Sequence, residues 1–179
     1  KTFFEVILAT SFDVNALRIL KRKKNLRIID ISNFKETSNS SIKLFNGSFL
    51  LQDKDNIIFN KKNLKFVTKN KPSKKEIEEI KFAFNICKFV KSNAIVLTNN
   101  FSTIGIGAGQ PSRLDSCKIA TQKAKLFQPN KLKNAIAASD AFFPFADGIK
   151  TLIKSGVNTI VQPGGSLRDN EAVEAANKA

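Results

Sequence analysis

The sequence predicts a layered α/β protein. Short apolar, partly β-branched segments alternate with segments whose apolar residues recur at the helical period, as strands and helices do when they follow one another. Capping and turn residues separate most of these segments. With 179 residues, of which 42% are hydrophobic and 25% charged, the chain can bury a core as one domain or two small ones.

The first third of the chain contains short elements. Asp13 can cap a helix, because its carboxylate accepts hydrogen bonds from the free N–H groups at a helix start. Val14, Leu17 and Leu20 share one face of that helix, and a basic run over 21–24 ends it favourably for the helix dipole. In order, the predicted elements are a strand over 3–9, this helix, a strand over 26–31, a Ser- and Asn-rich loop over 32–41, and strands over 47–52 and 64–68.

The clearest helix begins after Ser73. Ser73 and Glu76 form a Ser-x-x-Glu capping box, and apolar residues then recur at helical spacing to about Lys91. A second box, Ser166-x-x-Asp169, predicts the start of a terminal helix. The remaining predicted elements are strands over 93–97 and 103–106, a helix over 112–127, a strand over 135–138, a helix over 147–154 and a strand over 157–161.

The composition narrows the possible chemistry. The chain has no His, which excludes a His general base, a Ser-His-Asp triad and a His metal ligand within it. Cys87 and Cys117 are too few for a Cys-rich zinc site or a disulfide framework, so we expect reduced thiols and no metal. No apolar run approaches the roughly 20 residues of a membrane span. We therefore expect a cytoplasmic protein that contacts no membrane.

The charge is strongly positive, since 30 Lys and Arg residues against 15 Asp and Glu residues give +15. Such a balance is compatible with a Lys-rich module that binds nucleic acid. Only five of these cations are Arg, however, and base readout and bidentate phosphate capture favour Arg. We expect no nucleic-acid partner, and we keep this module, or a structural module that pairs with another chain, as alternative interpretations.

Two stretches near the middle of the chain contain residues that folding alone does not require. In the stretch 91–94, the amide of Asn93 can pair with a carboxamide of a ligand or serve an ordinary turn. In 103–113, glycines at alternate positions allow close approach to backbone or ligand, and Arg113 lies at a helix start that can bind an anion. Their spacing matches neither the dinucleotide fingerprint nor a Walker loop.

Two further stretches follow later predicted strands. In 138–148, three Phe surround Pro144 between two Asp, which suits either stacking on a flat heterocycle or a core plug with Asp147 capping a helix. In 162–169, glycines and Ser166 either expose N–H groups to a ligand or form a plain turn. Because ligands bind at strand ends in α/β sheets, the four stretches together indicate a site.

These stretches resemble the AICAR transformylase domain of the bifunctional purine biosynthesis family, which acts on aminoimidazole carboxamide ribonucleotide (AICAR). The matching runs are Val67-Thr68-Lys69, Lys91-Ser92-Asn93-Ala94-Ile95-Val96, Ile104-Gly105-Ile106-Gly107-Ala108-Gly109-Gln110, Ser112-Arg113, Ser139-Asp140-Ala141-Phe142-Phe143-Pro144-Phe145, Asp147-Gly148 and Gln162-Pro163-Gly164-Gly165-Ser166. The resemblance implies a cytidine-deaminase-like layered α/β/α fold without the deaminase zinc. Residues 1–179 would be a partial domain, its second half, truncated at both ends.

The resemblance also implies an activity. The family transfers a formyl group from 10-formyltetrahydrofolate to the amine of AICAR, and its other half is an IMP cyclohydrolase. The resemblance implies a homodimer in the full-length protein. It also allows a bound monovalent cation. The Lys-His pair that handles the amine proton in the family lies upstream of this segment, so we expect no catalytic residue here and no activity of the chain alone.

Site residues carry over one by one. Asn93 resembles the amide that positions the AICAR carboxamide, and Arg113 matches the arginine at the nucleotide or folate site. Phe142 and Asp147 fall on the motif that lines the pocket where folate meets AICAR. The further expected folate-pocket residues are Pro144, Phe145 and Ser166. The chain departs from the family at Ala146, where Arg is usual, and at Pro111, where a polar residue or Met is common.

Overall fold

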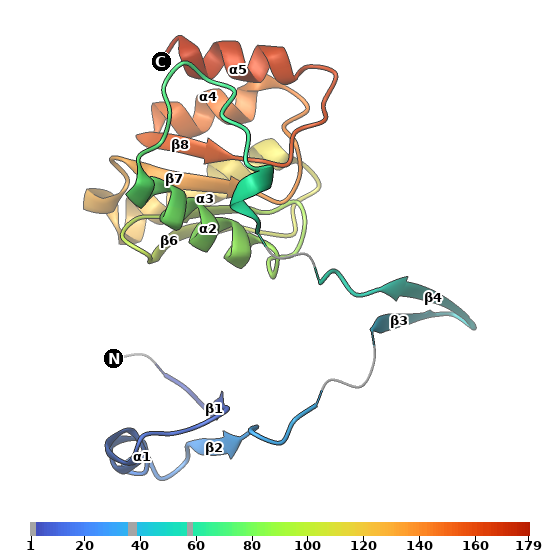
Figure 1. The fold of residues 1–179 in the computed structure, drawn as a ribbon, viewed down its shortest axis with the longest axis vertical. Coiled ribbons are helices and arrows are strands. Elements are labelled where there is room, and N and C mark those ends of the chain that lie inside the picture. The colour runs from blue at the N-terminus through green and yellow to red at the C-terminus, as the bar shows by residue number, and fades with distance from the viewer. Residues whose placement is uncertain (1–2, 36–38, 57–58) are drawn as a thin grey trace. The chain divides into compact units, whose positions relative to one another are not determined.

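The computed structural model describes residues 3–35, 39–56 and 59–179. These residues form two compact units, Lys1–Asn56 and Ile57–Ala179, which are described separately (Figure 1). Both units mix helices and strands, with five α-helices and three small sheets in the described part. The predicted α/β class is therefore confirmed.

The first unit begins with a strand–helix–strand arrangement. β1 (Val6–Ala9) pairs in parallel with β2 (Arg27–Asp30), and α1 (Val14–Leu20) connects them. Asp13 caps α1 as predicted, because its Oδ1 accepts hydrogen bonds from the N–H groups of Asn15 at 2.8 Å and Ala16 at 3.3 Å.

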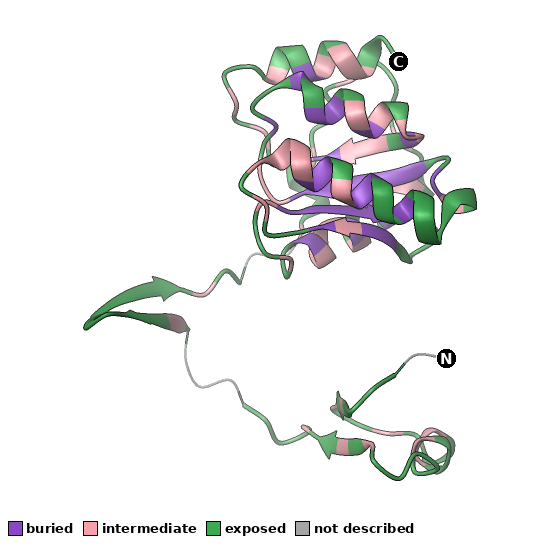
Figure 2. Ribbon diagram, turned by 180° about the vertical axis from the view of Figure 1, so that it is seen from behind, coloured by how far each residue is buried: buried purple, intermediate pink, exposed green. Residues whose placement is uncertain are grey.

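A hairpin completes the first unit. β3 (Ser40–Phe45) and β4 (Ser48–Asp53) pair antiparallel across a turn at Asn46 and Gly47, whose φ angles of 37° and 84° suit this residue pair. β4 was predicted, but β3 was not, because the flanking Ser-rich segment predicted a loop. None of the described residues of this unit is buried, in contrast to the second unit (Figure 2).

The second unit is built on a four-stranded sheet. The strand order is β6–β5–β7–β8, with β5 antiparallel to both neighbours and β7 parallel to β8. Its strands are β5 (Ile95–Thr98), β6 (Thr103–Gly107), β7 (Ala135–Ser139) and β8 (Val157–Val161). Its helices are α2 (Lys74–Cys87), α3 (Arg113–Phe127), α4 (Ala146–Lys154) and α5 (Asp169–Asn177), with short 3₁₀ turns at Lys61–Asn63 and Pro129–Lys131.

Helices cover both faces of this sheet (Figures 1 and 2). Because successive side chains of a strand point to opposite faces, Ile95 and Leu97 of β5 pack with α3 and α4, whereas Val96 packs with α2. α5 lies against α4 on the same side as α3. The second unit is therefore layered, with its apolar core on both sides of the sheet.

The segment before α2 and the C-terminal end of α2 differ from the prediction. The predicted strand over 64–68 does not form; Leu64 packs against the core beside α2, and this segment pairs with none of the strands in the described part of the chain. α2 ends at Cys87 rather than near Lys91. The carbonyl of Lys91 accepts a hydrogen bond from the N–H of Gly109 at 2.8 Å, so the chain after Cys87 turns toward the loop that follows β6.

One of the two predicted capping boxes forms. At α2, the Ser73 Oγ accepts from the N–H of Glu76 at 3.3 Å, and the Ser73 N–H donates to Glu76 Oε2 at 2.8 Å. The second prediction is wrong, because α5 begins only at Asp169. The Asp169 carboxylate accepts a hydrogen bond from the N–H of Gly165 at 2.7 Å. It therefore stabilises the glycine loop before α5 and does not take part in a capping box with Ser166.

The alternate glycines of β6 are packing residues. A Cβ added at Gly105 would lie 2.1 Å from the carbonyl oxygen of Ala120, and one at Gly107 would lie 2.0 Å from that of Ser116. Both carbonyls belong to α3, so the glycines allow β6 and α3 to approach backbone to backbone. This contact sets where α3 begins relative to the end of the sheet.

We expect Gly107→Ala to lower the free energy of unfolding by about 3 kcal/mol or more, because the new methyl group overlaps backbone that cannot move aside cheaply. Gly165→Ala is the matched control: its φ of 101° is strained for alanine, but no atom lies within 4 Å of the added Cβ. Its expected cost is about 1 kcal/mol. Urea unfolding measures both, and equal losses would contradict the packing role of Gly107.

Candidate functional site

The sheet topology brings all four motif stretches to one end of the second unit. Ile95 at the start of β5 pairs with Gly107 at the end of β6 and with Ser139 at the end of β7, and Val161 at the end of β8 pairs with Ala138. The segments that enter β5 and leave the other three strands therefore meet there. These are the stretches that the sequence singled out.

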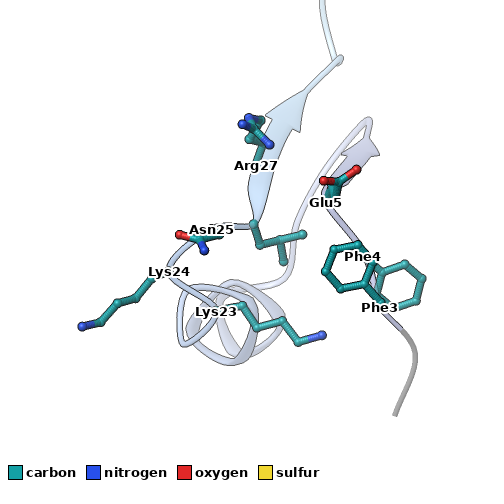
Figure 3. Close-up of a pocket in the computed structure, with 8 residues that line it drawn as sticks. Phe3, Phe4, Glu5, Lys23, Lys24, Asn25 and Arg27 are labelled. Carbon is teal, nitrogen blue, oxygen red and sulfur yellow. The ribbon is translucent and has the colours of Figure 1, made fainter.

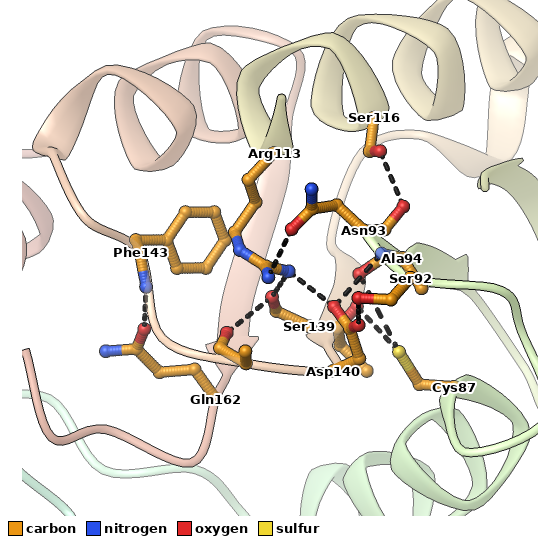
Figure 4. Close-up of polar contacts among 12 residues, drawn as sticks. Cys87, Ser92, Asn93, Ala94, Arg113, Ser116, Ser139, Asp140, Phe143 and Gln162 are labelled. Atoms are coloured by element: carbon orange, nitrogen blue, oxygen red, sulfur yellow. Dashed lines mark hydrogen bonds and ion pairs between the residues drawn. The ribbon is translucent and has the colours of Figure 1, made fainter. Parts of the chain in front are cut away.

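Arg113 lies at the centre of this end of the sheet, in the first turn of α3. Its Nη2 donates to Asn93 Oδ1 at 2.7 Å, and its Nη1 donates to Ser139 Oγ at 2.8 Å and forms an ion pair with Asp140 (Figure 4). The side chain is only 8% exposed. Its charge is thus held by three residues from two segments, the stretch before β5 and the end of β7.

The Asn93 amide is oriented by the same surroundings. Its Nδ2 donates to the carbonyl oxygens of Gln110 at 2.8 Å and Pro111 at 3.2 Å, while the backbone carbonyl of Asn93 accepts from Ser116 Oγ at 2.7 Å. Both amide protons are therefore engaged within the protein. The Oδ1 atom accepts from Arg113, and an amide oxygen has two lone pairs.

Asp140 accepts hydrogen bonds on both carboxylate oxygens. Oδ1 accepts from the N–H of Ala94 at 3.0 Å and from Arg113, and Oδ2 accepts from Ser92 Oγ. Burial raises the pKa of Asp140, but the hydrogen bonds from Ser92, Arg113 and Ala94 and the charge of Arg113 outweigh it, so the pKa lies below its usual value. Asp140 is ionised at neutral pH and compensates the buried guanidinium.

The sequence allowed the Phe-rich stretch to be either a core plug or an exposed stacking surface, and the structure contains both kinds of Phe. Phe143 is 1% exposed and joins the core, and its N–H donates to Gln162 Oε1 at 2.7 Å (Figure 4). Phe142 and Phe145 are 41% and 51% exposed. The Arg168 guanidinium lies 5.0 Å from the centre of the Phe145 ring, so the loops after β7 and β8 are in contact.

The other expected pocket residues lie in these same two loops. Pro144 is exposed, and so is Asp147, whose Oδ1 accepts from the N–H of Gly148 at 2.6 Å in the first turn of α4. Ser166 is partly buried, and its Oγ accepts from the N–H of Arg168 at 3.1 Å. Asn93 and Arg113 are thus in direct contact, while the expected folate residues lie in the loops after β7 and β8.

Sequence reasoning did not identify the roles of Ser92, Ser139, Asp140 and Gln162. All four lie inside the motif stretches, but none was expected as a site residue. Asp140 follows β7 directly, and its position opposite Ala94 depends on pairing between strands far apart in the sequence. The position of Asp140 directly after a predicted buried strand was the signal in the sequence that could have identified it as a site residue.

An open recess in the first unit is lined by Phe3, Phe4, Glu5, Lys23, Lys24, Asn25, Leu26 and Arg27 (Figure 3). The Lys23 ammonium lies 5.4 Å from the centre of the Phe4 ring. No predicted site residue lines it. In the part of the chain that the structure describes, no cluster of three His, Cys, Asp or Glu side chains is placed to bind a metal, and no helix is long and apolar enough to cross a membrane.

Comparison with known proteins places the chain in a family. Residues 1–123 match the AICARFT/IMPCHase bienzyme family, and the chain belongs to it. It is 46% identical over 176 residues to the bifunctional purine biosynthesis protein PurH of Aquifex aeolicus, and 46% identical over 179 residues to that of Buchnera aphidicola. These alignments cover 98% and 99% of this chain but 34% of each relative, so the chain spans about a third of their length. The resemblance predicted from the motifs is confirmed.

We expect Asp140→Asn to lower the free energy of unfolding by about 3 kcal/mol at pH 7, because it leaves the buried Arg113 charge without its partner. The lowered pKa of Asp140 means that its contribution is complete above the unfolded-state value near 3.8 and is lost as pH falls through the folded-state value. The difference between wild type and variant in urea unfolding should therefore shrink as the pH falls below about 4.

Asp115→Asn is the matched control for this measurement. Asp115 lies on the same helix as Arg113, is 50% exposed and pairs with Lys118 at 3.5 Å. Such a surface pair contributes at most about 1 kcal/mol. A difference between wild type and Asp140→Asn that stays constant from pH 7 to pH 3 would contradict the assigned ionisation of Asp140.

Proposed function

We propose that this chain is part of an AICAR transformylase that transfers the formyl group of 10-formyltetrahydrofolate to the amine of AICAR, in a protein that also carries IMP cyclohydrolase. The observation that carries this proposal is membership of the bienzyme family over residues 1–123. The convergence of all four motif stretches at one end of the sheet supports it, because a shared ligand explains why residues so far apart in the sequence meet there.

The finer fold assignment belongs to the same proposal. Helices on both faces of the four-stranded sheet support a cytidine-deaminase-like layered α/β/α fold. Residues 1–179 would form one partial domain, the second half of the transformylase. In the full-length protein we propose a homodimer located in the cytoplasm.

The site residues divide between the two substrates. Asn93 would accept a hydrogen bond from the AICAR carboxamide on the second lone pair of its Oδ1. Arg113 would fix the orientation of the Asn93 amide and would itself lie at the nucleotide or folate site. Phe142, Pro144 and Phe145 would provide exposed apolar walls for the folate, and Ser166 would lie in the adjoining loop. Asp147 would hydrogen-bond the pterin ring.

Formyl transfer joins the AICAR amine nitrogen to the formyl carbon and breaks the bond from that carbon to N10 of the folate. A positioned base takes the amine proton, and N10 is protonated as it leaves. Binding energy serves to bring the two reactants together. Since the chain contains no His, the family's Lys-His pair would come from outside it, and we expect the chain alone to bind substrate without turnover.

The test of nucleotide binding is calorimetric titration of the folded chain with AICAR. We expect saturable binding, and we expect Asn93→Ala to weaken it at least about tenfold, since one polar contact to a desolvated ligand contributes about 1–2 kcal/mol. Asn130→Ala is the matched control, because Asn130 is exposed in the turn that precedes the start of β7, at the other end of that strand. Unchanged affinity in folded Asn93→Ala would refute the role of Asn93.

The folate side is tested separately in the full-length protein that contains this chain. We expect Asp147→Ala to raise the KM for 10-formyltetrahydrofolate about tenfold or more, because it removes a charged hydrogen-bond acceptor, and to leave the KM for AICAR within about twofold. Lys154→Ala, at the far end of the same helix and exposed, should change neither value. Equal effects of both variants would argue against a pterin contact at Asp147.

A further inference from the structure

We propose that Asp140 is a positioning residue for nucleotide binding: it holds Arg113 and the turn from Ser92 to Ala94 in the one arrangement in which Asn93 can bind the AICAR carboxamide. The inference rests on the proposed function of Asn93 and adds a residue that neither the motif analysis nor the family resemblance assigned to the site.

The contacts of Asp140 surround Asn93 along the chain. The residue before Asn93 donates its hydroxyl to Asp140 Oδ2, and the residue after it, Ala94, donates its N–H to Oδ1 at 3.0 Å. The same two residues share a second hydrogen bond, in which the Asp140 N–H donates to the Ala94 carbonyl at 3.3 Å. The backbone on both sides of Asn93 is therefore tied to one carboxylate.

The same carboxylate also holds Arg113, the residue that donates to the side-chain oxygen of Asn93. Arg113 donates to Asn93 Oδ1 through Nη2 while its Nη1 pairs with Asp140 (Figure 4). With 8% of its side chain exposed, Arg113 cannot rely on water to compensate its charge. Removal of the Asp140 charge would favour movement of the guanidinium toward solvent, away from the Asn93 amide.

Asp140 acts through these neighbours and not on the ligand. Three donors of the protein already occupy its two oxygens, and its side chain is 17% exposed. A purely structural anchor would make a different prediction, because its loss would lower stability without changing the affinity for one substrate selectively. The KM values for the two substrates of the proposed reaction therefore distinguish a positioning role from a purely structural one.

The experiment uses the full-length protein that contains this chain and compares Asp140→Asn, Asp140→Glu and Ser92→Ala with wild type. We expect Asp140→Asn to raise the KM for AICAR at least tenfold while the KM for 10-formyltetrahydrofolate stays within twofold. Asp140→Glu keeps the charge and should recover part of the loss. Asp115→Asn, an exposed carboxylate on the helix of Arg113, should leave both values unchanged.

Ser92→Ala keeps the inference testable if Asp140→Asn does not fold. Ser92 is exposed, so loss of its hydroxyl leaves the core intact, yet it removes one of the donors to Asp140. We expect its KM for AICAR to rise about threefold. An unchanged KM in folded Asp140→Asn, or in Ser92→Ala where Asp140→Asn does not fold, would overturn the inference.

Two further outcomes are distinct from these. Parallel increases in both KM values that follow the loss of thermal stability would make Asp140 a structural anchor and overturn the inference. A wild-type protein that neither binds AICAR nor transfers a formyl group would refute the proposed function itself, and the inference with it. In that case the failure is visible before any variant is compared.

Discussion

The buried charge of Arg113 is the constraint on which this end of the second unit depends. A guanidinium with so little exposure to water needs acceptors in fixed positions, and the structure supplies them from the start of β5, the end of β7 and the residue after it. Two segments distant in the sequence are thereby joined to the first turn of α3. These contacts fix the guanidinium relative to the ends of both strands.

The rest of the second unit places that side chain. The glycines of β6 bring the backbone of α3 against the strand, so Arg113 in the first turn of α3 reaches the end of the sheet. Alanines buried along β7 leave room for helices on both faces. Small residues at these positions serve close packing, and the packing in turn positions the polar groups.

The first unit contrasts with this arrangement. Its strands form two separate two-stranded sheets, and none of its described residues is buried. Large apolar side chains of the hairpin, such as Leu44 and Phe49, are 82% and 68% exposed. Local pairing and capping account for its elements, whereas the second unit adds a core that involves every strand of its sheet.

The sequence by itself determined the α/β class, nearly all the elements of the second unit, and the four stretches that meet at the candidate site, because caps, turns and apolar periods are local signals. Two strand predictions failed: the segment 64–68 pairs with none of the described strands, and β3 was missed although its partner β4 follows it across the local turn at Asn46 and Gly47. Only the tertiary structure decided that Phe143 fills the core while Phe142 stays exposed, and that Asp140 meets Arg113. Those outcomes depend on strand order and helix docking, which bring together residues that no local pattern connects.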